Sequence, residues 1–130
     1  MPKEKKFSQQ PAAQKAESLI ASLEDHKAHD LSAFSLPQGD PLAEVVIICT
    51  ASSARHARSL ADAAVEACKA NNFEYLHTEG YQEGDWILVD MNDIILHIFL
   101  GPSRERYKLE ALLNDAAPLS IAGSAPADFQ

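Results

Sequence analysis

The segment 84–99 constrains the fold more than any other part of this sequence. It reads GDWILVDMNDIILHIF, and its alternating pattern predicts two short strands over 85–90 and 93–99. The residues between them, Met91 and Asn92, form a predicted two-residue turn. Asparagine tolerates the left-handed backbone conformations that such turns require. We therefore predict a β-hairpin.

The two faces of this hairpin differ in character. One is uniformly aliphatic and is expected to enter the core: Ile87, Val89, Ile94, Leu96 and Ile98. The turn predicts that Trp86 lies opposite His97, and Asp90 opposite Asp93, on the other face beside Leu88. Like charges directly opposite one another destabilise a strand pair by up to about 1 kcal/mol.

This second face has two interpretations. Trp is a favoured residue at the centre of protein interfaces, so a tryptophan ringed by acids fits a basic protein partner. Alternatively, Trp86 packs under a helix and the acids only solvate the turn. The periodicity of the segment leaves both interpretations open.

The charge of the chain is also unevenly distributed. The 130 residues carry a formal net charge of -8, which argues against direct sequence-specific binding of nucleic acid, because phosphate contacts need a basic surface. Between Lys69 and Arg104 there is no Lys or Arg. The acids of that span would steer a basic partner to the hairpin: Glu74, Glu79, Glu83, Asp85, Asp90 and Asp93.

Cysteine usage and hydropathy predict the compartment. Cys49 and Cys68 both fall in apolar settings without a ligand motif, as expected for buried, reduced thiols in a cytoplasmic protein. No apolar run is long enough to cross a membrane. The first residues, MPKEKKFSQQP, lack the apolar core of a secretion signal.

The remaining elements follow from apolar spacing and from the Gly and Pro residues that interrupt it. The fold class is α/β, a single domain over 12–116 with a mixed β-sheet flanked by helices. Nearly all residues of its central strand are apolar, which predicts cover on both faces. In chain order we predict a disordered arm over 1–11, a helix over 12–29, an edge strand over 31–36, the central strand over 44–50, a helix over 54–70, a strand over 73–78, a helix over 103–114 capped by Ser103, with Arg104 exposed, and a flexible tail over 117–130.

A second candidate surface lies where the central strand meets the following helix. Ser52 or Ser53 would cap that helix, and Arg55 and His56 follow in its first turn. Such a helix N-terminus can bind an anion. The segment has none of the glycines of a phosphate-binding loop, so capping with an exposed charged surface is the favoured interpretation.

An enzymatic role would rest on Asp90 and Asp93. Two carboxylates across a tight turn could bind a metal ion or perform acid–base chemistry. Metal-dependent nucleotidyl transfer also needs a third carboxylate and a glycine-rich loop for the triphosphate, and the sequence has no such loop. We predict no catalytic residue, metal or cofactor, and retain a metal-dependent nucleotidyltransferase-like enzyme as the alternative.

Several short motifs together resemble the ribosomal silencing factor family, the Iojap-related proteins. The similarity covers about residues 30–116 in the same order and spacing. The motifs are ICTASSARH at 48–56, AD at 61–62, EG at 79–80, Trp86, VD at 89–90, Asp93, HIF at 97–99 and RYKLE at 106–110. Where family members usually have Asp-Tyr-Gly-Asp, this chain has Asp90-Met-Asn-Asp93, which changes the proposed contact.

The resemblance implies a nucleotidyltransferase-like topology without catalytic residues and a role in translation. Members of the family bind the large-subunit ribosomal protein fourteen, block joining of the small subunit and repress translation under nutrient limitation. An assembly factor for the large subunit would need the same contact and remains an alternative function. The sequence is also compatible with a homodimer. On this basis the predicted partner-binding residues are Trp86, Leu88, Asp90, Met91, Asp93 and His97, with Ser52, Ser53, Arg55 and His56 as a secondary surface.

Overall fold

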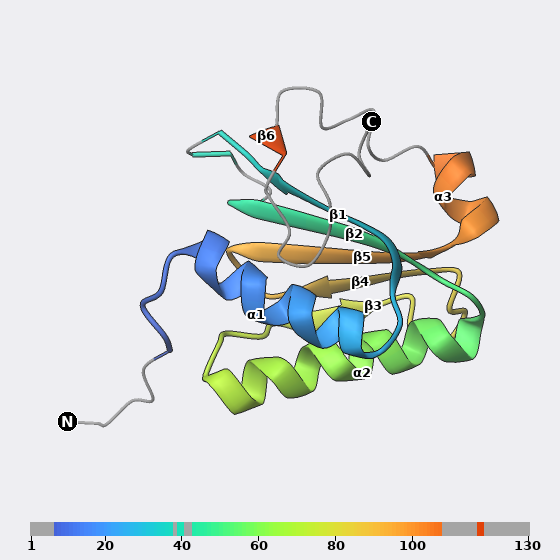
Figure 1. Ribbon diagram of the computed structural model, residues 1–130, viewed down its shortest axis with the longest axis horizontal. Coiled ribbons are helices and arrows are strands. Elements are labelled where there is room, and N and C mark those ends of the chain that lie inside the picture. Colours follow the sequence, from blue (N-terminus) through green and yellow to red (C-terminus); the bar gives the residue numbers. More distant parts are fainter. Residues whose placement is uncertain (1–6, 38, 41–42, 108–116, 119–130) are drawn as a thin grey trace.

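The computed structural model describes residues 7–37, 39–40, 43–107 and 117–118. Its strands form one six-stranded sheet in the order β3-β4-β5-β2-β1-β6, and α1 and α2 lie together on one side of that sheet (Figure 1). The predicted α/β class and single mixed sheet are confirmed. The elements are α1 (Ala12–Asp25), β1 (His29–Ser35), β2 (Val45–Ala51), α2 (Ala54–Asn71), β3 (His77–Glu79), β4 (Trp86–Asp90), β5 (Ile94–Leu100), α3 (Gly101–Tyr107) and β6 (Ala117–Pro118).

The centre of the sheet is the parallel pair β2 and β5, in register from Val45 opposite Ile94 to Ala51 opposite Leu100. Every residue of β2 is buried, which confirms the central strand predicted from its apolar composition. The other pairs of neighbouring strands are antiparallel. The sheet is therefore mixed.

The main core lies between the sheet and the two helices. Apolar residues of α1 such as Leu19 and Leu23 meet Leu60 of α2 and the inward residues of β2, β4 and β5 there. Each fully buried side chain of this kind contributes about 1.5–3 kcal/mol. A smaller cluster on the opposite face joins Val46, Ile48 and Phe99 to the half-buried Phe34, Leu36 and Trp86.

Helix α2 has the ends that its sequence predicts. Ser53 is its N-cap, with Oγ accepting a hydrogen bond from the His56 backbone N–H at 3.0 Å, an arrangement typically worth about 1 kcal/mol. Its C-cap, Asn72, adopts the left-handed conformation at φ 59°. Asparagine is, after glycine, the residue best suited to that position.

Helix α1 ends earlier than the spacing predicted. The predicted helix over 12–29 stops at Asp25, and His26 is its C-cap. Lys27 and Asp30 then take φ values of 69° and 49°, so the chain reverses and His29 already belongs to β1. The prediction was wrong here because apolar spacing does not report where a backbone reversal occurs.

Three further predictions need correction. The strand predicted over 73–78 is the shorter β3, and α3 begins at Gly101, so Ser103 lies inside the helix, buried, rather than at its N-cap. Residues 117–118 of the predicted flexible tail pair with β1 as β6. Residues 1–6, 108–116 and 119–130, which include most of the predicted arm, helix end and tail, lie outside the described residues.

Both cysteines are free and buried, as predicted. Burial raises the pKa of the Cys49 thiol to about 12 and that of Cys68 to about 11. Within the part of the chain that the structure describes, no helix is both long and apolar enough to cross a membrane.

Candidate functional site

Strands β4 and β5 form the predicted hairpin, but the turn lies one residue further along the chain. Trp86 is opposite Phe99, and Leu88 is opposite His97. The Met91 N–H donates to the Ile94 carbonyl at 2.9 Å, so Asn92 and Asp93 form the turn. The predicted pairs of Trp86 with His97 and Asp90 with Asp93 were therefore wrong by two residues.

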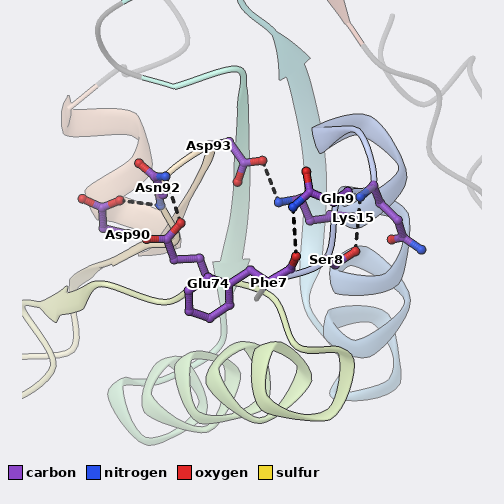
Figure 2. Close-up of polar contacts among 9 residues, drawn as sticks. Phe7, Ser8, Gln9, Lys15, Glu74, Asp90, Asn92 and Asp93 are labelled. Carbon is purple, nitrogen blue, oxygen red and sulfur yellow. Dashed lines mark hydrogen bonds and ion pairs between the residues drawn. The ribbon is translucent and has the colours of Figure 1, made fainter. Parts of the chain in front are cut away.

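This turn is held by side chains around Asn92, which has a φ of 74°. Its backbone N–H donates to Asp90 Oδ1 at 2.9 Å, and its Nδ2 donates to Glu74 Oε1 at 3.0 Å. Figure 2 shows Asp90 and Glu74 both directed at Asn92. A carboxylate that accepts from the backbone two residues later stabilises a tight turn.

Asp93 faces a helix rather than Asp90. Its Oδ2 lies 2.7 Å from Lys15 Nζ on α1, and Figure 2 shows the two side chains meeting. Asp93 was predicted to pair with a basic partner on the surface beside Trp86. That assignment is corrected, because its carboxylate already forms an internal ion pair on the side of the sheet covered by α1.

Met91 is also on the helix-covered side. It is buried in the main core, and only 2% of its surface is exposed. With the turn at 92–93, Met91 continues β4 and shares the face of Val89, since side chains two apart on a strand point the same way. The prediction that Met91 lies beside Trp86 at the partner contact is therefore wrong.

The other predicted residues of the hairpin do share one face. The Trp86 indole Nε1–H donates to His97 Nδ1 at 3.0 Å, and the Trp86 ring lies 5.0 Å from the Phe99 ring. Trp86, Leu88 and Asp90 are half-buried, while His97 is only 8% exposed. His97 and Phe99 thus support Trp86 from within.

Burial also fixes the protonation state of His97. The loss of solvation lowers its pKa from 6.5 to about 4, so the ring is neutral at neutral pH. A neutral imidazole whose Nδ1 accepts a hydrogen bond carries its proton on Nε2. The Trp86 side chain is therefore oriented by an uncharged acceptor.

Strand β3 extends this face to the edge of the sheet with residues that the hairpin pattern did not identify. His77 and Glu79 lie opposite Asp90 and Leu88. His77 Nε2 is 2.7 Å from Glu79 Oε2, and its Nδ1 is 3.8 Å from Asp90 Oδ2. Alternation in residues 77–79 is consistent with His77 and Glu79 sharing a face, but three residues are too few to predict a strand from their pattern. We call Trp86, Leu88, Asp90, His77 and Glu79 the Trp86 face.

The turn before β4 needs glycine next to Trp86. Gly80 has a φ of 77°, and a Cβ there would lie 2.2 Å from the Trp86 carbonyl oxygen. The same turn is tied to α2, because Arg58 donates to the Gln82 carbonyl at 3.0 Å and the Tyr81 hydroxyl donates to Asp62. These contacts position the start of β4, and therefore Trp86.

Most residues of the predicted secondary surface make internal hydrogen bonds, which hold the start of α2 to the end of α1. The Ser52 N–H donates to His56 Nδ1 at 3.0 Å, so that nitrogen carries no proton, and Nε2–H of His56 donates to the His26 carbonyl at 2.8 Å. With Ser53 as the N-cap, the capping interpretation is confirmed. Arg55 is exposed.

The carboxylate pair required by the enzyme alternative is not formed. Asp93 is bound to Lys15, and Asp90 accepts from Asn92. Among the described residues, no group of three or more His, Cys, Asp or Glu side chains is arranged to hold a metal ion. The arrangement suits recognition of another macromolecule: an aromatic side chain held in one orientation, flanked by carboxylates.

Fold and face together define a single-domain α/β protein with an aromatic and acidic face on one side of its sheet. The family model described as "Ribosomal silencing factor during starvation" matches residues 9–128, and the chain belongs to this family. A relative in Haemophilus influenzae, named ribosomal silencing factor, is 35% identical over 96 residues, covering 74% of this chain and 94% of its own.

Two further comparisons bear on fold and role. A crystal structure of a Chromobacterium violaceum protein superimposes with a TM-score of 0.77 at 26% identity, covering 93% of this chain and all of the other. A protein of Mus musculus, 26% identical over 119 residues, covers 85% of this chain and 52% of its own. It is named "Mitochondrial assembly of ribosomal large subunit protein 1".

Proposed function

We propose that this protein binds the large ribosomal subunit through the Trp86 face and blocks joining of the small subunit, which represses translation in the cytoplasm when nutrients are limiting. The proposed partner is the basic surface of large-subunit ribosomal protein fourteen. Membership of the ribosomal silencing factor family supports the role. No catalytic step is part of the proposal.

The observation that carries the proposal is the fixed orientation of Trp86. Its ring is supported by Phe99 and held by His97, so little side-chain entropy remains to be lost on binding. Asp90 and Glu79 are on the same face and Glu74 lies at the adjoining turn, in a stretch without Lys or Arg. An aromatic anchor surrounded by acids is complementary to a basic protein surface.

A role in assembly of the large subunit is the second candidate function. It is favoured by the similarity to the Mus musculus protein, whose name refers to assembly of that subunit. The two roles need the same contact and differ only in whether the bound protein prevents subunit joining. A binding experiment followed by addition of small subunits separates them.

The test is co-sedimentation with purified large ribosomal subunits, comparing the wild type with Trp86→Ala. Truncation of a central anchor should weaken binding by about 2 kcal/mol, or roughly 30-fold. The matched control is Glu66→Gln on α2, a 74% exposed side chain remote from the Trp86 face, which should bind like the wild type.

Small subunits are then added to the bound complex. Binding that depends on Trp86 and prevents joining supports silencing. Binding that depends on Trp86 but permits joining supports assembly. If the wild type does not sediment with large subunits, or if Trp86→Ala binds as tightly as Glu66→Gln, the proposed interface is wrong.

A further inference from the structure

We propose that β3 is a docking edge, to which a basic, extended segment of the ribosomal partner adds as a further strand of the sheet. This inference rests on the proposed function and specifies how the partner is bound. It extends the contact from the side chains of the Trp86 face to the backbone of Thr78. The occupant is a β-strand rich in Lys or Arg.

Strand β3 is the outer strand at its end of the sheet, paired with β4 alone among the described residues. The Met91 N–H donates to the Ile94 carbonyl and the Leu100 N–H donates to the Asp85 carbonyl, so the backbone groups of Leu88 and Asp90, at the alternate positions of β4, are directed at β3. His77 and Glu79 lie opposite Asp90 and Leu88 and therefore direct their own N–H groups at β4. The N–H and C=O groups of Thr78 point away from the sheet, where an added strand would pair with them.

The approach to this edge exposes apolar side chains. Tyr75 and Leu76, directly before β3, are 38% and 49% exposed, and only one other large apolar residue of the described chain, Phe7, is comparably exposed. A side chain as large as Leu gains about 1.5–3 kcal/mol on full burial. An added strand that ran past β3 would cover part of this surface.

The two edges of the sheet are protected differently. Proteins commonly guard an exposed edge with Pro or Lys, which hinder strand addition. The far edge, β6, contains Pro118. By contrast, residues 73–80, FEYLHTEG, contain neither Pro nor Lys. The edge at β3 is short, but it has neither of the residues that hinder the addition of a strand.

Charge selects the kind of strand that this edge accepts. Glu79 is exposed, and the half-buried Asp90 lies on the other side of the His77 ring from it. Glu74 lies beside Asn92 at the hairpin turn, and the span between Lys69 and Arg104 holds no basic residue to offset these acids. A strand with Lys or Arg on the side of the Trp86 face would place its cations near these carboxylates. Neighbouring strands lie about 4.8 Å apart, so the same partner could contact both β3 and β4.

Three variants separate the backbone contact from the charge. Glu79→Gln removes a carboxylate and keeps every N–H, so it tests the charge. Thr78→Ala shortens the side chain and keeps the N–H, whereas Thr78→Pro also removes the N–H, at a position where it is directed away from β4 and the preceding residue is already extended, as proline requires. Binding to purified large subunits should weaken a further three- to tenfold, roughly one hydrogen bond, from Thr78→Ala to Thr78→Pro.

Hydrogen exchange of the wild type gives the same test without a mutation. The Thr78 amide should exchange rapidly in the free protein and be protected when large subunits are bound. The amides of His77 and Glu79, directed at β4, should be protected in both states. Thermal melting of Thr78→Pro checks that it folds.

The outcomes distinguish this inference from the proposed function. If Trp86→Ala weakens binding while Thr78→Pro binds like Thr78→Ala and the Thr78 amide stays unprotected, strand addition is overturned and the Trp86 face stands. If the wild type does not bind large subunits, the proposed function fails, and this inference fails with it. Protection of the Thr78 amide together with the extra loss in Thr78→Pro would establish the docking edge.

Discussion

Lys15 Nζ lies 2.7 Å from Asp93 Oδ2, and this ion pair joins α1 to the tip of the hairpin that carries Trp86. The Lys15 side chain is 8% exposed and that of Asp93 is 24% exposed. The Asp93 carbonyl also accepts from the N–H groups of Glu44 and Val45 at 2.9 and 3.1 Å. One residue of the turn therefore connects a helix, the central strand and the hairpin that carries Trp86.

The two halves of this ion pair should differ in their effect on stability. Asp93→Asn leaves a buried ammonium without its counter-charge and should lower the free energy of unfolding by about 3 kcal/mol. Lys15→Met should cost less, because the remaining carboxylate keeps access to water and Met fills a similar volume. Urea denaturation of both variants and of the double variant measures each cost and the coupling between them. Equal costs with no coupling would show that the pair contributes little.

The hairpin shows what its sequence could and could not determine. Alternation assigned Ile87, Val89, Ile94, Leu96 and Ile98 to the core face, and all are buried there. It could not locate the turn, because a slip of two residues between the strands keeps the side chains of the paired residues on their faces and changes only the residues at the turn. The turn depends on Asn92 and its contacts with Asp90 and Glu74, which are side-chain interactions rather than a periodicity.

For the site, too, the sequence predicted which strand residues share a face but not where the residues at the turn lie. Trp86, Leu88, Asp90 and His97 share one face as the alternation predicted, whereas Met91 and Asp93 lie on the other side because of the slipped turn. Arg104, predicted to be exposed, donates to the Asp30 carbonyl and to Thr50 Oγ1. Its partners lie 74 and 54 residues away in the sequence, a separation that no local pattern reports.

Gly80 should be the glycine least tolerant of substitution near the site. Gly80→Ala forces a Cβ to within 2.2 Å of the Trp86 carbonyl oxygen at a φ of 77°, so the start of β4 must move. Gly39→Ala is the matched control, because its φ of 85° is similar and nothing lies within 4 Å of the added Cβ. The control should lose about 1 kcal/mol from the backbone conformation alone.

Gly80→Ala should lose more stability than this control, and it should also bind large subunits more weakly, because Trp86 is displaced. Thermal melting and co-sedimentation of the two variants measure these effects. If the two substitutions have the same cost, the close approach of Gly80 to Trp86 has no energetic consequence.

The two cysteines should be unreactive in the native protein. Burial raises the pKa of Cys49 to about 12 and of Cys68 to about 11, and only the thiolate attacks thiol reagents. At pH 8, labelling by an aromatic disulfide should therefore proceed only as fast as the protein unfolds. The control is Ser59→Cys on α2, an exposed position, which should react within minutes. Rapid labelling of the wild type without denaturant would contradict the burial.

His97 should make the stability of the protein depend on pH below neutrality. In the unfolded chain its pKa is the ordinary 6.5, and in the folded protein burial lowers it to about 4. Between these values the unfolded state binds more protons, so the free energy of unfolding is undiminished above pH 6.5 and falls as the pH decreases. The contribution from His97 should amount to a loss of about 3 kcal/mol by pH 4.

The same titration should be visible at Trp86, the single tryptophan of the chain. Protonation of His97 removes the acceptor for the indole N–H, which is now 3.0 Å away, so Trp86 fluorescence should change together with stability. His97→Asn is the matched control, because its amide oxygen can accept from the indole but does not titrate. In that variant the part of the pH dependence due to His97 should disappear. If His97→Asn and the wild type lose stability in parallel between pH 6.5 and 4, other groups cause the loss, and the hydrogen bond to Trp86 is not under the control of His97 protonation.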